Sequence, residues 1–161
     1  MKKFRFLLLA LFASSFVANA QVKITHPGPG TPERIAVLDG IRSTTQAELK
    51  IPEVQYVVNT INVTNDWAYV SVAAKRKDGK PINAKAVCAY EIHGDACITK
   101  IEAVLRNMNG TWKLEEYFGG ATDLWQMGYC DKKNFPIEIF GMKRSELCPA
   151  GYGQSMPPTK K

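Results

Sequence analysis

Histidine is scarce in this chain, and several widespread catalytic motifs are missing from it. Only two histidines occur, His26 and His93, in 161 residues. A serine or cysteine nucleophile normally needs a histidine within hydrogen-bond reach, and only His93 falls in the part expected to fold. The chain has no G-x-S-x-G, H-E-x-x-H or P-loop motif. The sequence therefore gives little support for hydrolase, metallopeptidase or nucleoside triphosphatase chemistry.

Cysteine is also sparse, and its spacing does not suit a metal. The four cysteines are Cys88, Cys97, Cys130 and Cys148. None of them forms a C-x-x-C pair, and the chain lacks an H-x-x-x-H pair as well. Structural zinc sites usually draw their ligands from such closely spaced pairs. We expect no metal, no cofactor and no dithiol redox activity.

Long apolar runs are absent after residue 20, and residues 1–20 read as a secretory signal peptide. They combine three basic residues, a short apolar run and the small-x-small sequence Ala18-Asn19-Ala20. Residue 21 is Gln21 rather than cysteine, so lipid attachment is not indicated. Removal of the three cations lowers the net charge from +6 to +3, which does not argue for nucleic acid. We expect a periplasmic or secreted protein without a membrane span.

Export makes disulfides the default state of the four cysteines. Three connectivities are open, and the sequence alone does not select one. We favour Cys88–Cys97 together with Cys130–Cys148, because each pair closes a local loop. A loop of that size contributes about 3 kcal/mol in the chain-entropy description of disulfides.

The rest of the chain reads as one domain with two loose ends. Proline and glycine mark residues 21–30 as an extended leader, 31–148 forms the domain, and 149–161 is a flexible tail. The domain opens with a helix, because Thr31 can cap it and Pro32 suits its first position. Gly40 costs about 1 kcal/mol in a helix, so we expect a short helix that ends near Ser43. The alternative is that Gly40 allows close packing on a sheet.

Residues 54–75 predict a first β-hairpin with Asn65-Asp66 at its turn. A two-residue turn places Val63 opposite Ala68 and Val57 opposite Ala74, all on one apolar face. The other face is rich in hydroxyl groups and carries three aromatic side chains, Tyr56, Trp67 and Tyr69. These aromatics are either a structural cross-strand cluster, the interpretation we favour, or a patch that binds a partner.

Residues 98–118 predict a second hairpin, because Asn109-Gly110 suits a type I′ turn. Leu105 then faces Leu114, and Ile101 faces Phe118. Four polar residues belong to the opposite, water-facing surface: Glu102, Arg106, Lys113 and Glu115. Together with a possible strand over 86–92, the pattern indicates an α+β fold: one N-terminal helix packed on a four- or five-stranded antiparallel sheet, stapled by disulfides.

Glu116 is the one polar residue on the predicted apolar face of its strand. A buried carboxylate would need a partner or a raised pKa, so we consider a candidate pocket. Its members are Glu116, Tyr117, Asp123 and Trp125. The simpler alternative, which we favour, is that Glu116 lies at the sheet edge and reaches water.

Three motifs suggest a resemblance. They are R-x-A-V-L-D-x-I-R at 34–42, D-W-A-Y-V at 66–70 and N-G-T-W at 109–112. In this order the chain resembles a group of small exported bacterial proteins of uncharacterised function. A helix followed by an antiparallel meander also resembles the cystatin-like and NTF2-like architectures, in which a sheet wraps a helix. The resemblance rests on packing and turn residues and carries no chemistry.

Two function classes follow from these patterns. The first is an exported protein that binds another periplasmic or envelope protein, such as an inhibitor, an immunity protein or an accessory factor. The second is an NTF2-like protein that binds a small molecule, or an enzyme that uses a pocket carboxylate. We favour the first class, without catalysis, and leave the partner and the oligomeric state open.

Overall fold

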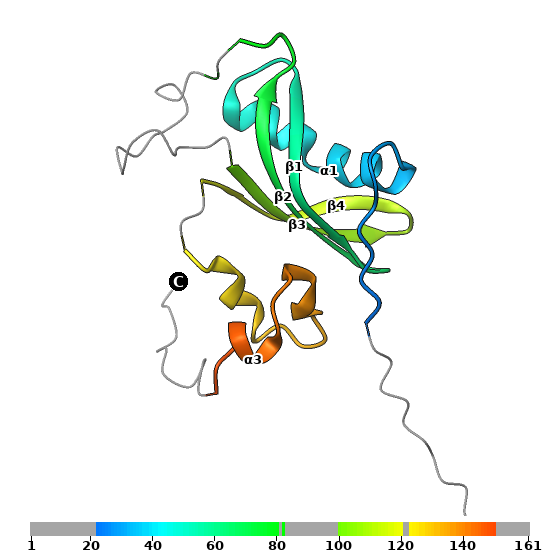
Figure 1. The fold of residues 1–161 in the computed structure, drawn as a ribbon, viewed down its shortest axis with the longest axis vertical. Coiled ribbons are helices and arrows are strands. Elements are labelled where there is room, and N and C mark those ends of the chain that lie inside the picture. Colours follow the sequence, from blue (N-terminus) through cyan, green and yellow to red (C-terminus); the bar gives the residue numbers. More distant parts are fainter. Residues whose placement is uncertain (1–21, 81, 83–99, 121–122, 151–161) are drawn as a thin grey trace, which may run out of the picture.

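The computed structural model describes residues 22–80, 82, 100–120 and 123–150 (Figure 1). The predicted signal peptide, the possible strand over 86–92, the Cys88–Cys97 pair and residues 151–161 lie outside the described residues. Within these ranges, helix α1 (Pro32–Leu49) is followed by the antiparallel strands β1 (Val54–Val63), β2 (Trp67–Arg76), β3 (Lys100–Met108) and β4 (Thr111–Gly119). Three short helices complete the chain: η2 (Trp125–Tyr129), η3 (Ile137–Phe140) and α3 (Arg144–Leu147).

The sheet is a meander with strand order β1-β2-β3-β4. Helix α1 packs against one side of it, and the three short helices lie on the other side (Figure 1). The prediction of an α+β fold, with one helix on a four-stranded antiparallel sheet, is confirmed.

Helix α1 begins as predicted and runs longer than predicted. The Thr31 hydroxyl accepts a hydrogen bond from the Arg34 amide, and Pro32 occupies the first helical position. The predicted end near Ser43 is wrong, because the helix continues to Leu49 and so buries Thr45 and Leu49. A Cβ at Gly40 would lie 2.5 Å from Leu105 Cδ2, so the alternative of close packing on the sheet is confirmed.

The first hairpin contains a β-bulge that changes which side chains share a face. Val63 pairs with Ala68 as predicted, but the register shifts between Val58 and Thr60. Tyr56, rather than Val57, therefore lies opposite Ala74. One extra residue turns every side chain before it to the other face of the strand.

The second hairpin has the predicted turn and a second bulge. Asn109 and Gly110 both have positive φ, 56° and 84°, as a type I′ turn requires. Leu105 pairs with Leu114 as predicted, but the register shifts after this pair, so Phe118 pairs with Glu102 rather than Ile101. The shift places Glu116 and Phe118 on the face away from α1.

The core between α1 and the sheet is mainly aliphatic. Its innermost side chains include Val37 and Ile41 of α1, with Val70, Ile101 and Leu105 of the central strands. Burial of this apolar surface is the main contribution that holds the helix on the sheet.

The other face of the sheet is covered by residues 123–148, which we call the C-terminal segment. It brings an aromatic cluster onto Tyr69 and Val104, with Tyr129, Phe135 and Phe140 buried at its centre. Cys130 and Cys148 form a disulfide within this segment, so the predicted pairing is confirmed. The prediction that Glu102 faces water is wrong, because this side chain is buried beneath the segment.

The leader is attached to the sheet rather than free. Thr25 and Val63 exchange two backbone hydrogen bonds, of 2.8 and 2.9 Å, beside the far end of β1. The His26 ring nitrogen Nδ1 lies 2.7 Å from the side-chain oxygen Oδ1 of Asn62, and the side-chain Nδ2 of Asn62 donates to the Ile139 carbonyl. The leader, β1 and the C-terminal segment are therefore connected by polar contacts.

Candidate functional site

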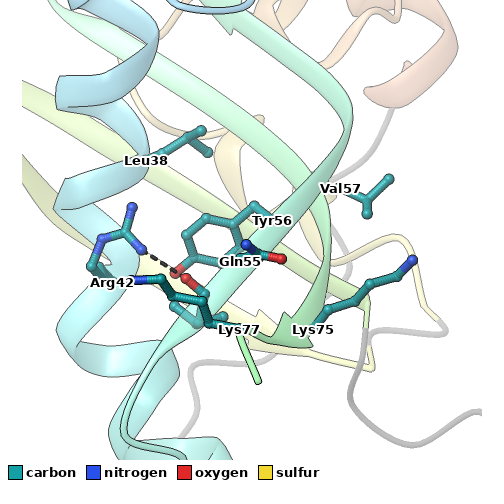
Figure 2. Close-up of a pocket in the computed structure, with 8 residues that line it drawn as sticks. Leu38, Arg42, Gln55, Tyr56, Val57, Lys75 and Lys77 are labelled. Carbon is teal, nitrogen blue, oxygen red and sulfur yellow. Dashed lines mark hydrogen bonds between the residues drawn. The ribbon is translucent and has the colours of Figure 1, made fainter. Parts of the chain in front are cut away.

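A groove lies between α1 and the outer edge of β1, with a volume of about 590 Å³. Figure 2 shows Leu38 and Arg42 on the α1 side and Tyr56 between them and the strand, with Lys77 extending toward Arg42 and Lys75 on the other side of the groove. The remaining lining residues come from β1: Val54, Gln55 and Val57. Val57 is unusual for an apolar strand residue, since 45% of it is exposed.

Alternate backbone groups of β1 beside this groove point away from β2. The backbone amide of Lys77 donates to the Glu53 carbonyl, so this carbonyl faces β2. The backbone of Val63 instead bonds to Thr25, on the side away from β2. Because inward and outward groups alternate along an antiparallel strand, the groups of Tyr56 and Val58 face outward. Among the described residues, no strand pairs with this part of β1.

One outward carbonyl is already occupied. Arg42 donates to the Val54 carbonyl at 2.9 Å, the contact dashed in Figure 2, and also pairs with Asp39 at 2.9 Å. Its guanidinium lies over the Tyr56 ring, 5.5 Å from the centroid. This arrangement fixes the tyrosine ring as the wall of the groove and holds a cation beside the free edge.

Among the residues that the structure describes, the groove is lined by cations and by no carboxylate. Arg42 has Asp39 as a partner and Lys77 has Glu53, at 3.2 Å, but Lys75 forms no ion pair within the described ranges. Asp39 and Glu53 belong to the surroundings rather than to the lining. The groove therefore has an excess of positive charge at its Lys75 end.

Two tyrosine hydroxyls are buried under α1, beside the groove. Burial raises the pKa of Tyr56 above its usual value, and burial raises the pKa of Tyr117 to about 12. Neither hydroxyl has a hydrogen-bond partner among the described residues, and both lie near Thr45, which donates to the Ile41 carbonyl. Both tyrosines are therefore neutral at physiological pH, and their rings pack against the core between α1 and the sheet.

The other two predicted aromatics lie on the opposite face of the sheet. Trp67 meets the Phe135 ring edge-on at 5.0 Å, and Tyr69 meets Phe140 in the same way at 5.2 Å. Tyr69 is buried, and burial with the nearby Glu102 charge raises its pKa to about 12. The prediction of a common face for Tyr56, Trp67 and Tyr69 is wrong: the bulge at Asn59 separates Tyr56 from the other two.

The four residues of the predicted pocket are not brought together. Glu116 is partly exposed and pairs with Lys132 at 3.2 Å, whereas Tyr117 lies on the α1 side of the sheet. Asp123 is exposed, and Trp125 stacks on Phe118 at 4.1 Å. Glu116 therefore reaches water, as the favoured alternative predicted. The reason is the bulge at Glu115, which turns the Glu116 side chain away from the core under α1.

A different carboxylate is buried, and it holds the C-terminal segment on the sheet. Glu102 Oε2 accepts from the Trp125 indole at 2.7 Å and from the Gln126 amide at 3.0 Å. Its other oxygen pairs with Lys100 at 2.8 Å. Three donors satisfy this charge, so it acts as an attachment point rather than a free acid. The sequence did contain one signal for this buried layer. Val104 is an apolar residue on the strand face that was predicted to contact water, so it breaks the polar pattern of that face.

The comparisons add no relative to these observations. No protein-family model, curated protein or solved structure matches the chain. Across the described ranges no helix is both long and apolar enough to cross a membrane. In the same ranges, no three histidine, cysteine or acidic side chains gather as a metal would require.

Proposed function

We propose that this chain is an exported, non-catalytic binding protein that contacts another periplasmic or envelope protein through the outer edge of β1. The observation that carries the proposal is the combination of a strand edge without a partner strand among the described residues, an exposed Val57 and an adjoining groove walled by Tyr56. An extended segment of a partner can add to such an edge by main-chain hydrogen bonds, while the groove receives alternate side chains.

The sequence supports export to an oxidising compartment, and the arrangement of helix and strands supports a more specific fold assignment. The signal-peptide pattern of residues 1–20 and the Cys130–Cys148 disulfide both suit an oxidising compartment. For the fold we propose a cystatin-like or NTF2-like sheet. One long helix against four antiparallel strands, with a bulge in each hairpin, is the arrangement that lets a sheet curve around a helix.

Photocrosslinking inside the natural host tests the proposal. Benzoylphenylalanine replaces Val57 at the edge of β1, and in a matched strain it replaces Met108, which is 54% exposed at the tip of the other hairpin. We expect one discrete protein adduct from position 57 and none of that mass from position 108.

Two outcomes would contradict the proposal. Equal adducts from both positions would indicate unspecific contact with neighbouring proteins. No adduct at position 57, with a small molecule retained by the purified chain in native mass spectrometry, would move the function to ligand binding or catalysis.

A further inference from the structure

We infer that the segment received by the edge of β1 is extended and acidic, with apolar residues at alternate positions. This inference rests on the proposed function and names the chemistry of the partner. Its basis is the distribution of charge and apolar surface on the two sides of the free edge.

Cations lie on both sides of the edge. Arg42 projects from α1 on the Tyr56 side, and Lys75 belongs to β2, where it pairs with Gln55. Lys77 follows two residues later, and Lys80 stands exposed beyond it. An added strand places its side chains alternately on these two sides, so a carboxylate on either side meets a cation.

Apolar surface is interleaved with the cations. Leu38 and Val54 contribute to the groove on the side of Tyr56, and Val57 is exposed on the opposite side of the strand. Ile35 lies one helical turn before Leu38 and is 50% exposed. A partner strand that alternated carboxylate and aliphatic side chains would place all its carboxylates on one side of the edge, toward Lys75, and its aliphatic side chains on the other side, over Leu38 and Val54.

Charge disfavours two other occupants of the edge. A second copy related by a twofold axis would bring the Lys75 end or the Arg42 side of one molecule against cations of the other. The chain's own tail, 151–161, contains two lysines and no acidic residue, so it carries the same sign of charge as the groove. An acidic segment of another protein is the occupant that satisfies the site.

The test uses the secreted, disulfide-bonded chain and three synthetic octapeptides, acetylated and amidated at their ends. The peptides alternate valine with glutamate, glutamine or lysine, and carry a fluorophore for anisotropy. We expect the glutamate peptide to bind about fivefold more tightly than the glutamine peptide, which corresponds to two exposed ion pairs. The lysine peptide should bind more weakly than either. The advantage of glutamate should shrink in 0.5 M salt, where exposed charges are screened.

Two variants locate the effect. The double substitution Lys75→Gln and Lys77→Gln should remove most of the glutamate advantage, whereas Lys143→Gln, an exposed cation on the C-terminal segment, should leave it intact.

Equal binding of the glutamate and glutamine peptides would overturn the acidic preference while leaving edge binding in place. If none of the three peptides binds while a crosslinked protein is still found at position 57, the extended binding mode is wrong, but the proposed contact through this edge still holds. A dimer in sedimentation that Val57→Lys disrupts would assign the edge to a second copy and overturn the inference.

Discussion

The two faces of the sheet are closed by different means. Helix α1 closes one face with aliphatic side chains, and its close approach depends on a residue without a side chain, Gly40. The C-terminal segment closes the other face with aromatic rings, one disulfide and a buried carboxylate, Glu102. A regular helix buries its apolar stripe by its own periodicity, whereas the segment has only short helices of four or five residues.

The difference shows what an irregular layer needs in order to stay in place. Short helices do not persist in water without tertiary contacts, so cross-links and polar attachment points must replace periodicity. Arg144 illustrates this, because it donates to the Phe135 carbonyl at 2.9 Å inside the segment. The helix side should thus respond mainly to changes of volume, and the segment side to the loss of specific bonds.

The largest expected effect comes from removing the disulfide. The double substitution Cys130→Ala and Cys148→Ala should lower the free energy of unfolding by about 3 kcal/mol, because the bond closes a loop of moderate length. We expect near-ultraviolet circular dichroism, which reports the aromatic cluster, to be lost at lower urea than the far-ultraviolet signal of α1. Ser145→Ala, on the exposed side of α3, is the control. Coincident transitions for both signals would show that the two faces form a single cooperative unit.

A smaller loss should follow Glu102→Gln. Neutralising the carboxylate weakens the hydrogen bonds from Trp125 and Gln126 and removes the ion pair with Lys100, at a cost of about 2 kcal/mol. Urea unfolding followed by tryptophan fluorescence measures the change. Glu115→Gln, exposed on β4, should alter stability by less than about 0.5 kcal/mol. A similar small change for Glu102→Gln would mean that the carboxylate does not hold the segment.

The smallest expected effects come from replacing one glycine on each side of the sheet by alanine. Gly40→Ala should destabilise the fold by about 1 kcal/mol, because crowding against Leu105 and the Trp112 carbonyl exceeds the gain in helix propensity. Gly128→Ala has no atom within 4 Å of the new methyl group and should be neutral or slightly stabilising. Thermal unfolding of both variants is the measurement. Stabilisation by Gly40→Ala would show that α1 can move away from the sheet without loss.

Local signals predicted the regular parts of this fold well. The cap at Thr31, the turn at Asn109-Gly110 and the Cys130–Cys148 pairing depend on residues near one another in sequence, and all three are confirmed. The pairs nearest each turn were also correct, because register is fixed there by the turn itself.

The bulges and the second layer could not be predicted in the same way. A bulge at Asn59 or Glu115 adds one residue without changing composition, so every face assignment beyond it reverses. The aromatics of the C-terminal segment have no helical or strand period, and their packing on Tyr69 depends on contacts between distant parts of the chain. The groove shares this origin, since Arg42 and Lys75 come from different elements and no motif links them.

The bridge between Thr25 and Val63 sets a limit on how long a partner could remain bound. It occupies the edge of β1 at one end, and Arg42 occupies the Val54 carbonyl at the other, so within the described part of the chain only a short stretch of backbone stays open between them. Interfaces of this small size are typical of transient complexes, which dissociate rapidly. Such a site suits repeated capture and release of a segment. A long-lived inhibitory complex would need a second contact surface to slow its dissociation.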